Sequence, residues 1–289
     1  MSTDAEFLGL VEAGSPGRFT FVVQDHLAAH ADGHLYGGTA LAVSITAAEL
    51  VSERRALWMT TQFVATAPTQ TTISVHAEVL APGRRTNQVR VTGTDEGGRT
   101  MFASLGATGR YKPGGLDGTF ERPPSVSAPG DSERWANPVV GLARAAGFEA
   151  QLPNLSPDSG FGAAIEFRGP QLHEHPDPGP GRMCLWLRRR DGVPVTAALA
   201  AFMADFVPLS VAAACGAKAG GVSLDNTIRI GAVEPTEWVL LDLRPHLAVG
   251  GYGHGAVQMW NEEGQLLATA SQTASMFDLT LDRLGALQR

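Results

Sequence analysis

The chain has 289 residues, of which 44% are hydrophobic and 18% charged, so it is long and apolar enough for one large domain or two ordinary ones with a real core. This composition excludes a disordered chain. The formal net charge of −7 lacks the clustered basic excess of nucleic-acid-binding proteins, and we expect no nucleic-acid partner.

The N-terminal residues "MSTDAEFLGLVEAG" carry acids where a secretory signal has a basic region, and no apolar segment follows them. The most apolar stretch of the chain is interrupted by Asp205 and Pro208, so no run reaches the roughly 18 apolar residues of a membrane span. Cys184 and Cys215 are isolated and form no CxxC pair, which fits a reducing compartment. We therefore expect a cytoplasmic protein without a membrane span.

Residues 37–51 show helical periodicity, with Leu41, Ile45, Ala48 and Val51 on one side. Four extended runs follow, each rich in alternating apolar or β-branched residues and separated by proline or glycine. These runs cover residues 57–67, 71–81, 86–95 and 100–109. The pattern predicts one helix followed by four antiparallel strands.

The same order returns near the C-terminus, where residues 195–216 are predicted to form a helix. Four further strands are predicted over residues 221–233, 237–247, 255–264 and 265–276. Residues 111–160 concentrate proline, glycine and polar residues, which is typical of a connector. The expected organisation is a first unit over residues 1–110, a connector over 111–160 and a second unit over 161–289.

Two short matches set the register between the repeats. Pro68–Gln70 matches Pro235–Glu237 at an offset of 235 − 68 = 167, and Asp95–Gly98 matches Asn261–Gly264 at 261 − 95 = 166. An antiparallel sheet wrapped around one apolar helix is a hotdog, and two such units can pair their exposed sheet edges. The predicted fold is therefore α+β: a double hotdog, with two helix-plus-antiparallel-sheet repeats forming a continuous sheet.

Four segments resemble type II acyl-CoA thioesterases, and the resemblance extends over nearly the whole chain. "HLYGGTALA" is similar to the family's H-V-F-G-G-Q opening of the first hotdog helix, and "FMADFVPLSVA" to its Y-x-S-D-x-x-x-L-P segment. "SLDNTIRI" is similar to T-I/L-D-H-S/T-x-x-F, and "LLATASQTASM" to L-V-A-S-x-x-Q-E-G. The segments occupy residues 34–42, 202–212, 223–230 and 266–276.

The resemblance implies that Asp205, Ser223 and Gln272 are catalytic and activate a water that attacks the thioester of an acyl-CoA. These groups suit that task, because a carboxylate accepts the water's proton while a hydroxyl and a carboxamide orient it. The resemblance implies no cofactor apart from the coenzyme A of the substrate, and it implies a homodimer or a larger homo-oligomer. An acyl-CoA thioesterase is thus the leading functional hypothesis.

The chain departs from the family pattern at several positions, which affects the expected substrate range more than the reaction. The departures are Thr39 for glutamine, Asn226 for histidine, Ser223 for threonine, and Thr273 and Ala274 for Glu-Gly. The repeat offsets provide an independent check on the three catalytic candidates. Their equivalents in the first unit (205 − 167, 223 − 167 and 272 − 166) are Gly38, Ala56 and Gly106, none of which has a functional side chain.

The first unit is nevertheless expected to contribute to substrate binding through His34, Gly37 and Gly38. The two glycines open a helix, whose free N–H groups can face a carbonyl oxygen or a phosphate. His34 stands near the helix start and is also explained as a polar residue satisfied by the backbone.

Other motifs have structural explanations beside the functional ones. Asp205 followed by Pro208 is also a normal way to cap and restart a kinked helix. "HEH" at His173–His175 stands beside prolines without further ligands, so we expect no metal site. "RRR" at Arg188–Arg190 fits either the phosphates of coenzyme A or a solvated turn.

Two alternative functions stay open at this stage. One is an acyl-CoA-binding hotdog protein that does not catalyse. The other is an enoyl-CoA hydratase-like enzyme with the motif D-x-N-P-x-H. Asp205 and Pro208 keep that spacing, but Val207 and Ser210 replace its asparagine and histidine, which makes hydration the weaker alternative.

Overall fold

The computed structural model describes residues 3–30, 33–112, 114–138, 140, 156, 158–172, 179–216, 219–231 and 234–278. The first unit contains two helices, a 3-10 turn and six strands. These elements are α1 (Thr3–Leu8), β1 (Val11–Glu12), β2 (Arg18–Val22), η1 (Asp25–Leu27), α2 (Gly37–Ser52), β3 (Arg55–Phe63), β4 (Thr72–Ala81), β5 (Thr86–Thr94) and β6 (Thr100–Gly109).

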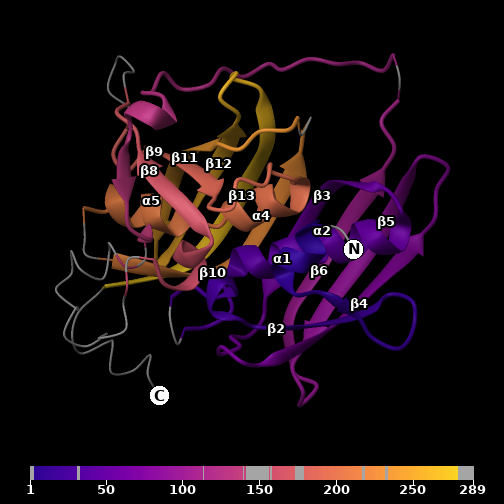
Figure 1. The fold of residues 1–289 in the computed structure, drawn as a ribbon. Helices are drawn as coiled ribbons and strands as arrows, with labels where there is room; N and C mark the ends of the chain where they lie inside the picture. Colours follow the sequence, from indigo (N-terminus) through magenta and orange to yellow (C-terminus); the bar gives the residue numbers. More distant parts are fainter. Residues whose placement is uncertain are drawn as a thin grey trace.

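The rest of the described chain repeats this pattern with additional short elements. These elements are η2 (Pro129–Asp131), β7 (Glu133–Trp135), η3 (Gly160–Ala163), β8 (Ile165–Gly169), β9 (Met183–Arg189), α4 (Ala197–Met203), α5 (Val207–Ala214), β10 (Ala219–Ile230), β11 (Val239–Val249), β12 (Tyr252–Trp260) and β13 (Leu266–Asp278). In Figure 1 the helices of both units lie against the curved strands, and the segment after β6 crosses from the first unit to the second.

The described strands form one 13-stranded antiparallel sheet, with the strands of each unit on one side of its centre. The order across the sheet is β1-β2-β4-β5-β6-β3-β10-β13-β12-β11-β9-β8-β7. β3 and β10 therefore join the two units edge to edge, which removes two unpaired sheet edges. The predicted double hotdog is confirmed.

The junction between β3 and β10 reveals a pseudo-two-fold axis. Thr60 lies opposite Thr227 in this antiparallel pairing, and their hydroxyl oxygens are 3.0 Å apart. The two residues differ by 227 − 60 = 167 positions, which is the repeat offset read from the sequence. Equivalent residues meet each other only on a symmetry axis, so the axis passes through this pair.

Each central strand also has a register shift at the equivalent place. In β3 the shift lies between Ala56 and Trp58, and in β10 it lies between Ser223 and Asp225. The two irregularities are again 167 residues apart. The repeats therefore share local backbone detail as well as strand order.

The core helix of each unit lies against its own four strands. α2 packs on β3, β4, β5 and β6, while α5 packs on β10, β11, β12 and β13. Every residue of α2 from Gly38 to Ala48 is buried, which explains why this helix is apolar or small on all sides. α4 packs on α2 and thereby connects the interiors of the two units.

The prediction of one helix over residues 195–216 is wrong in one respect. α4 ends at Met203 and α5 begins at Val207, so Asp205 lies in a three-residue break. Pro208 accounts for the break, because it has no N–H to continue the helical hydrogen bonds. Residues 197–214 are long and apolar enough for a membrane span by composition, and 72% of this stretch is buried inside the protein.

The segment expected as a connector contributes to the sheet as well. β7 pairs with β8, and Val126 forms a bridge with Leu172. The Trp186 indole N–H also donates to the Ser127 carbonyl at 2.9 Å. Residues 126–135 of this segment are therefore packed on the second unit instead of only joining the two units.

Candidate active site

Asp205 lies in the break between α4 and α5, and its side chain is 7% exposed. Ser223 comes from β10, immediately before the register shift of that strand. Gln272 comes from the neighbouring strand β13 and is 2% exposed. Three distant parts of the sequence thus converge on the inner face of the sheet.

The three side chains form a closed hydrogen-bonded triangle. Ser223 Oγ donates to Asp205 Oδ1 at 3.1 Å. Gln272 Nε2 donates to Ser223 Oγ at 2.6 Å and makes a second, closer contact with Asp205 Oδ1. The sequence-predicted catalytic residues are therefore brought together around one carboxylate oxygen.

The surroundings of Asp205 shift its proton equilibrium. Burial raises the pKa of Asp205 from 3.8 to about 7, because the low-dielectric interior disfavours the charged form. Hydrogen bonds from Ser223, Gln272, Asn226 and the Gly38 N–H act in the opposite direction and limit the rise. A carboxyl group with this pKa is suited to exchanging a proton near neutral pH.

Tyr36 is a site neighbour that the sequence reasoning missed. It precedes α2, and its buried hydroxyl has no hydrogen-bond partner of standard geometry among the described residues. Burial and the nearby Asp205 charge raise the pKa of Tyr36 well above its usual value, so the phenol is neutral. Tyr36 lies in the "HLYGGTALA" segment, at the phenylalanine of the family pattern, but the resemblance assigned no role to this position.

The first unit places its two glycines against the acid. A methyl group on Gly37 would overlap Asp205 Oδ2, and one on Gly38 would overlap the Phe202 carbonyl oxygen. Only residues without a side chain therefore allow the start of α2 to approach Asp205 this closely. His34 has an exposed side chain and forms a backbone bridge with Pro68, so it is not part of the hydrogen-bonded triangle.

Strand register supports the expected equivalences in the first unit. Gln272 pairs with Asn226 as Gly106 pairs with Met59, and the register shift after Ser223 matches the one after Ala56. The first unit has no acid, hydroxyl or carboxamide at these places. The candidate site is thus present once, in the second unit.

The three consecutive arginines are engaged in ion pairs within the chain. Arg188, Arg189 and Arg190 pair with Glu166, Asp191 and Asp158, respectively. Each guanidinium therefore has a carboxylate partner, which favours the structural interpretation of this motif.

Among the described residues, no group of three or more His, Cys, Asp or Glu side chains is arranged to hold a metal ion. The His173–His175 segment lies outside the described residues.

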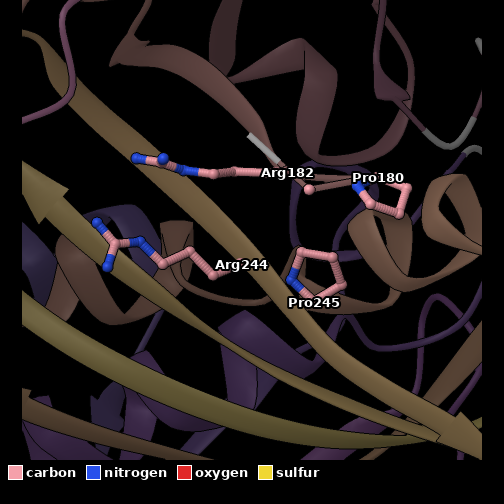
Figure 2. A pocket seen from close by; sticks show the side chains of 5 residues that line it. Pro180, Arg182, Arg244 and Pro245 are labelled. Atoms are coloured by element: carbon pink, nitrogen blue, oxygen red, sulfur yellow. The ribbon is translucent and has the colours of Figure 1, made fainter. Parts of the chain in front are cut away.

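A surface pocket of about 390 Å³ lies away from the triangle. Figure 2 shows Arg182 and Arg244 side by side in it, next to Pro180 and Pro245. Both arginines donate to the fully buried Asp242, at 2.9 Å from Arg182 Nε and 2.7 Å from Arg244 Nη2. None of the candidate site residues lines this pocket.

Comparisons with known proteins agree with this architecture. Residues 27–109 match a family model described as the acyl-CoA thioesterase N-terminal domain, and residues 123–276 match the corresponding C-terminal domain. A search of the curated proteins finds no significant match.

Solved structures show the same fold over almost the entire chain. A candidate thioesterase from Novosphingobium aromaticivorans is 29% identical, with a TM-score of 0.76 over 92% of this chain and 97% of that one. A hotdog protein of unknown function from Alicyclobacillus acidocaldarius is 19% identical, with a TM-score of 0.77 over 97% and 100% of the chains. Acyl-CoA thioesterase II TesB2 from Mycobacterium marinum is 17% identical, with a TM-score of 0.72 over 96% and 99%.

The family models cover both hotdog units, and the second model alone covers more than half of the chain. The chain therefore belongs to the acyl-CoA thioesterase family and is a thioester hydrolase.

Proposed function

We propose that the protein hydrolyses an acyl-CoA to a free fatty acid and coenzyme A, with a water molecule activated by Asp205, Ser223 and Gln272. The observation that carries this proposal is the hydrogen-bonded triangle around Asp205 Oδ1. The raised pKa of Asp205 supports its role as the general base.

The hydrogen bonds already made within the triangle indicate which of its atoms are left to bind the water. Ser223 uses its hydrogen on Asp205, and Gln272 Nε2 uses both of its hydrogens on Asp205 and Ser223. Gln272 Oε1 is buried and has no donor among the described residues. In the proposed arrangement a water donates one hydrogen to the Asp205 carboxylate and the other to Gln272 Oε1.

The proposed reaction is a direct hydrolysis. The water oxygen bonds to the thioester carbon while its proton moves to Asp205. The carbon–sulfur bond then breaks, and the proton from Asp205 neutralises the leaving thiolate. No covalent acyl-enzyme and no cofactor is needed, because a thioester is already a reactive acyl donor.

The carbonyl oxygen of the substrate needs hydrogen-bond donors of its own. The side-chain donors of the triangle are already used, and the Gly38 N–H donates to Asp205, so we assign this role to the backbone N–H of Gly37, the first residue of α2. The N–H groups at a helix start have no acceptor within the helix and carry partial positive charge. Gly37 is the first of these residues and lies against Asp205.

An aromatic cluster beside Asp205 is the proposed boundary of the acyl site. The Tyr36 ring lies 4.6 Å from that of Phe161, 5.2 Å from Phe202 and 5.9 Å from Phe206. These rings come from the segments before α2 and α5 and from α4 and η3. They provide the apolar surface that an acyl group needs next to the reacting carbon.

The direct test is hydrolysis of acyl-CoA substrates of different chain lengths, followed with a thiol-trapping dye. Wild-type protein should release coenzyme A, and Asp205→Asn should not. Equal rates for both proteins would reject the assignment of Asp205. Binding of acyl-CoA without turnover by the wild type would instead favour a non-catalytic binding protein.

Enoyl-CoA hydration is tested in the same preparations by loss of the conjugated thioester absorbance. The structure favours hydrolysis, because Ser210 is fully buried and donates to the Val207 carbonyl at 2.8 Å. Ser210 occupies the place of the histidine in the hydratase motif, and its hydroxyl is committed to the helix backbone. We expect no hydration by the wild type.

We also propose a homodimer or larger homo-oligomer. Three large side chains on the second unit are well exposed: Val222 of β10, Tyr252 of β12 and Val249 of β11. Tyr252 pairs with Ser275 and with Val249, and Ser275 pairs with Val222, so these residues form one row across the sheet. Light scattering should give a mass of at least twice 30.4 kDa.

A further inference from the structure

Asn226 is a fully buried amide beside the triangle, and the proposed mechanism gives it no role. It lies on β10 directly opposite Thr61 of β3 on one side and Gln272 of β13 on the other. Directly opposed residues of antiparallel strands point to the same face, so Asn226 shares the inner face with Gln272. Its Nδ2 donates to the carbonyl oxygen of Ala204 at 3.3 Å.

That carbonyl lacks a helical donor because of Pro208. In a continuous helix the Ala204 carbonyl would accept from the N–H four residues later, and residue 208 has none. A buried carbonyl that is left without a donor destabilises the folded state. Asn226 supplies the missing hydrogen. The carbonyl belongs to the peptide bond between Ala204 and Asp205, so this hydrogen bond holds the backbone of the acid directly.

The proline and the amide occur together in one unit and are both absent from the other. By the repeat offset, Leu41 is the first-unit equivalent of Pro208 (208 − 167), and Met59 is the equivalent of Asn226 (226 − 167). Leu41 and Met59 are fully buried core residues. A buried amide at this strand position is therefore not required by the fold, and it accompanies the helix break that contains the acid.

The first unit fixes the neighbour of Asn226 through a chain of hydroxyls. Ser44 donates to the Ala40 carbonyl at 2.8 Å, which uses its single hydrogen. The 2.8 Å contact between Ser44 and Ser104 therefore has Ser104 as donor, and the 2.8 Å contact between Ser104 and Thr61 has Thr61 as donor. Thr61 is thus held as a hydrogen-bond acceptor next to the Asn226 amide.

We infer that Asn226 is a positioning residue: it holds the Ala204–Asp205 peptide in the helix break, so that the carboxylate stays against Ser223 and Gln272. Its catalytic importance rests on the proposed function, whereas its structural role rests on the geometry alone. Asn226 also opposes the rise in the pKa of Asp205 that burial causes.

Groups from every adjoining element face the acid. They are Ser223 and Asn226 from β10, Gln272 from β13, and the Tyr36 phenol and Gly38 N–H from the start of α2. None of these groups is charged at neutral pH, because the phenol stays protonated. Loss of Asn226 therefore raises the pKa of Asp205 further, without a neighbouring charge that compensates.

The first experiment compares Asn226→Leu with Asn87→Leu as a matched control. Asn87 is another buried asparagine, on β5, where it accepts from Gly83 N–H and Arg54. Asn226→Leu should lower kcat about tenfold or more with little change in KM, and it should move the acid limb of the pH–rate profile to higher pH. Asn87→Leu should lower the Tm and leave that limb in place.

The second experiment needs no activity and uses Pro208→Ala. Alanine restores an N–H at residue 208, so the Ala204 carbonyl no longer depends on Asn226. Asn226→Leu should then lower the Tm less in the Pro208→Ala background than in the wild-type background. This coupling decides the structural role even if the wild type hydrolyses no acyl-CoA, which would reject the proposed function separately.

The inference is overturned by either of two results. One is a thermal double-mutant cycle in which the effects of Asn226→Leu and Pro208→Ala simply add. The other is an active Asn226→Leu enzyme whose acid limb coincides with that of the wild type. If the Asn226→Leu single variant does not fold, the acid limb of the pH–rate profile is compared between Pro208→Ala and the variant that carries both substitutions.

Discussion

The two hotdog units have the same strand order and the same register shift, but they differ where the core helix starts. The second unit has Asp205 there, supported by Ser223 and Gln272. The first unit has Gly37 and Gly38, which pack against that acid. The duplication thus provides two equivalent frameworks, of which one carries the polar groups and the other forms part of the wall around them.

This difference shows that the missing side chains of the first unit also have a structural function. A Cβ atom on Gly37 would occupy the space of the Asp205 carboxylate, and a Cβ atom on Gly38 would overlap the backbone of α4. An acid at Gly38, the equivalent place in the first unit, would therefore overlap the Phe202 carbonyl of α4, and a side chain at Gly37 would overlap Asp205 itself. The close packing of the two helix starts thus leaves room for the acid of the second unit and for no side chain opposite it.

The largest expected effect comes from replacing the acid of the second unit. Asp205→Asn should reduce acyl-CoA hydrolysis by about 10²–10⁴-fold, because the proposed general base is removed while its shape is kept. The measurement is kcat/KM by thiol release. A variant that retains more than a tenth of wild-type activity would show that another group accepts the proton.

Asp205→Asn should lower the activity but raise the stability of the folded protein at neutral pH. The pKa of Asp205 is raised from 3.8 to about 7 in the folded protein, so the folded state keeps a proton that the unfolded chain releases. Wild-type stability should therefore fall as pH rises from about 4 to 7, and then level off. Each pKa unit corresponds to about 1.4 kcal/mol, so the loss reaches at most about 4 kcal/mol.

Asp205→Asn lacks this titration and should have the higher Tm at pH 8, with a smaller difference at pH 4. Thermal unfolding of both proteins between pH 4 and pH 8 measures this difference in Tm. A wild-type Tm that exceeds that of the variant at pH 8 would contradict a buried, destabilised carboxylate.

A smaller effect is expected from exchanging the hydroxyl between the two units. Ser223→Ala removes the donor to Asp205 and should lower kcat about 10- to 100-fold, which corresponds to roughly 1.4–3 kcal/mol. Ala56→Ser places a hydroxyl at the equivalent position of the first unit and should leave kcat unchanged. Equal losses from both substitutions would show that the strands, and not the site, are responsible.

The smallest effect concerns the symmetry axis itself. Thr60→Val removes the hydroxyl contact with Thr227, which should cost about 0.5–1.5 kcal/mol of stability and leave kcat unchanged. Chemical denaturation and the thiol-release assay measure the two quantities. A clear drop in kcat would indicate that the junction between the units transmits strain to the site.

Much of the fold was readable from the sequence because the chain repeats. Alternating apolar residues predicted the eight main strands, and short matches such as Pro68–Gln70 with Pro235–Glu237 predicted the offset that the Thr60–Thr227 pair confirms. The candidates Asp205, Ser223 and Gln272 came from the resemblance to the family, and no periodicity by itself brings them together. Their hydrogen-bonded contact is a property of the folded chain.

The sequence by itself determined the two units, their order and the residue types available for chemistry, since these depend on local periodicity and on repeated patterns. Only the tertiary structure decided that the long apolar segment breaks at Asp205 and that Gly37 and Gly38 leave room for the acid. It also decided that Asn226 donates to the Ala204 carbonyl, which lacks a helical donor because of Pro208. The reason is physical: burial, steric overlap and hydrogen-bond partners depend on residues that are distant in sequence. They are set when the sheet brings these residues together.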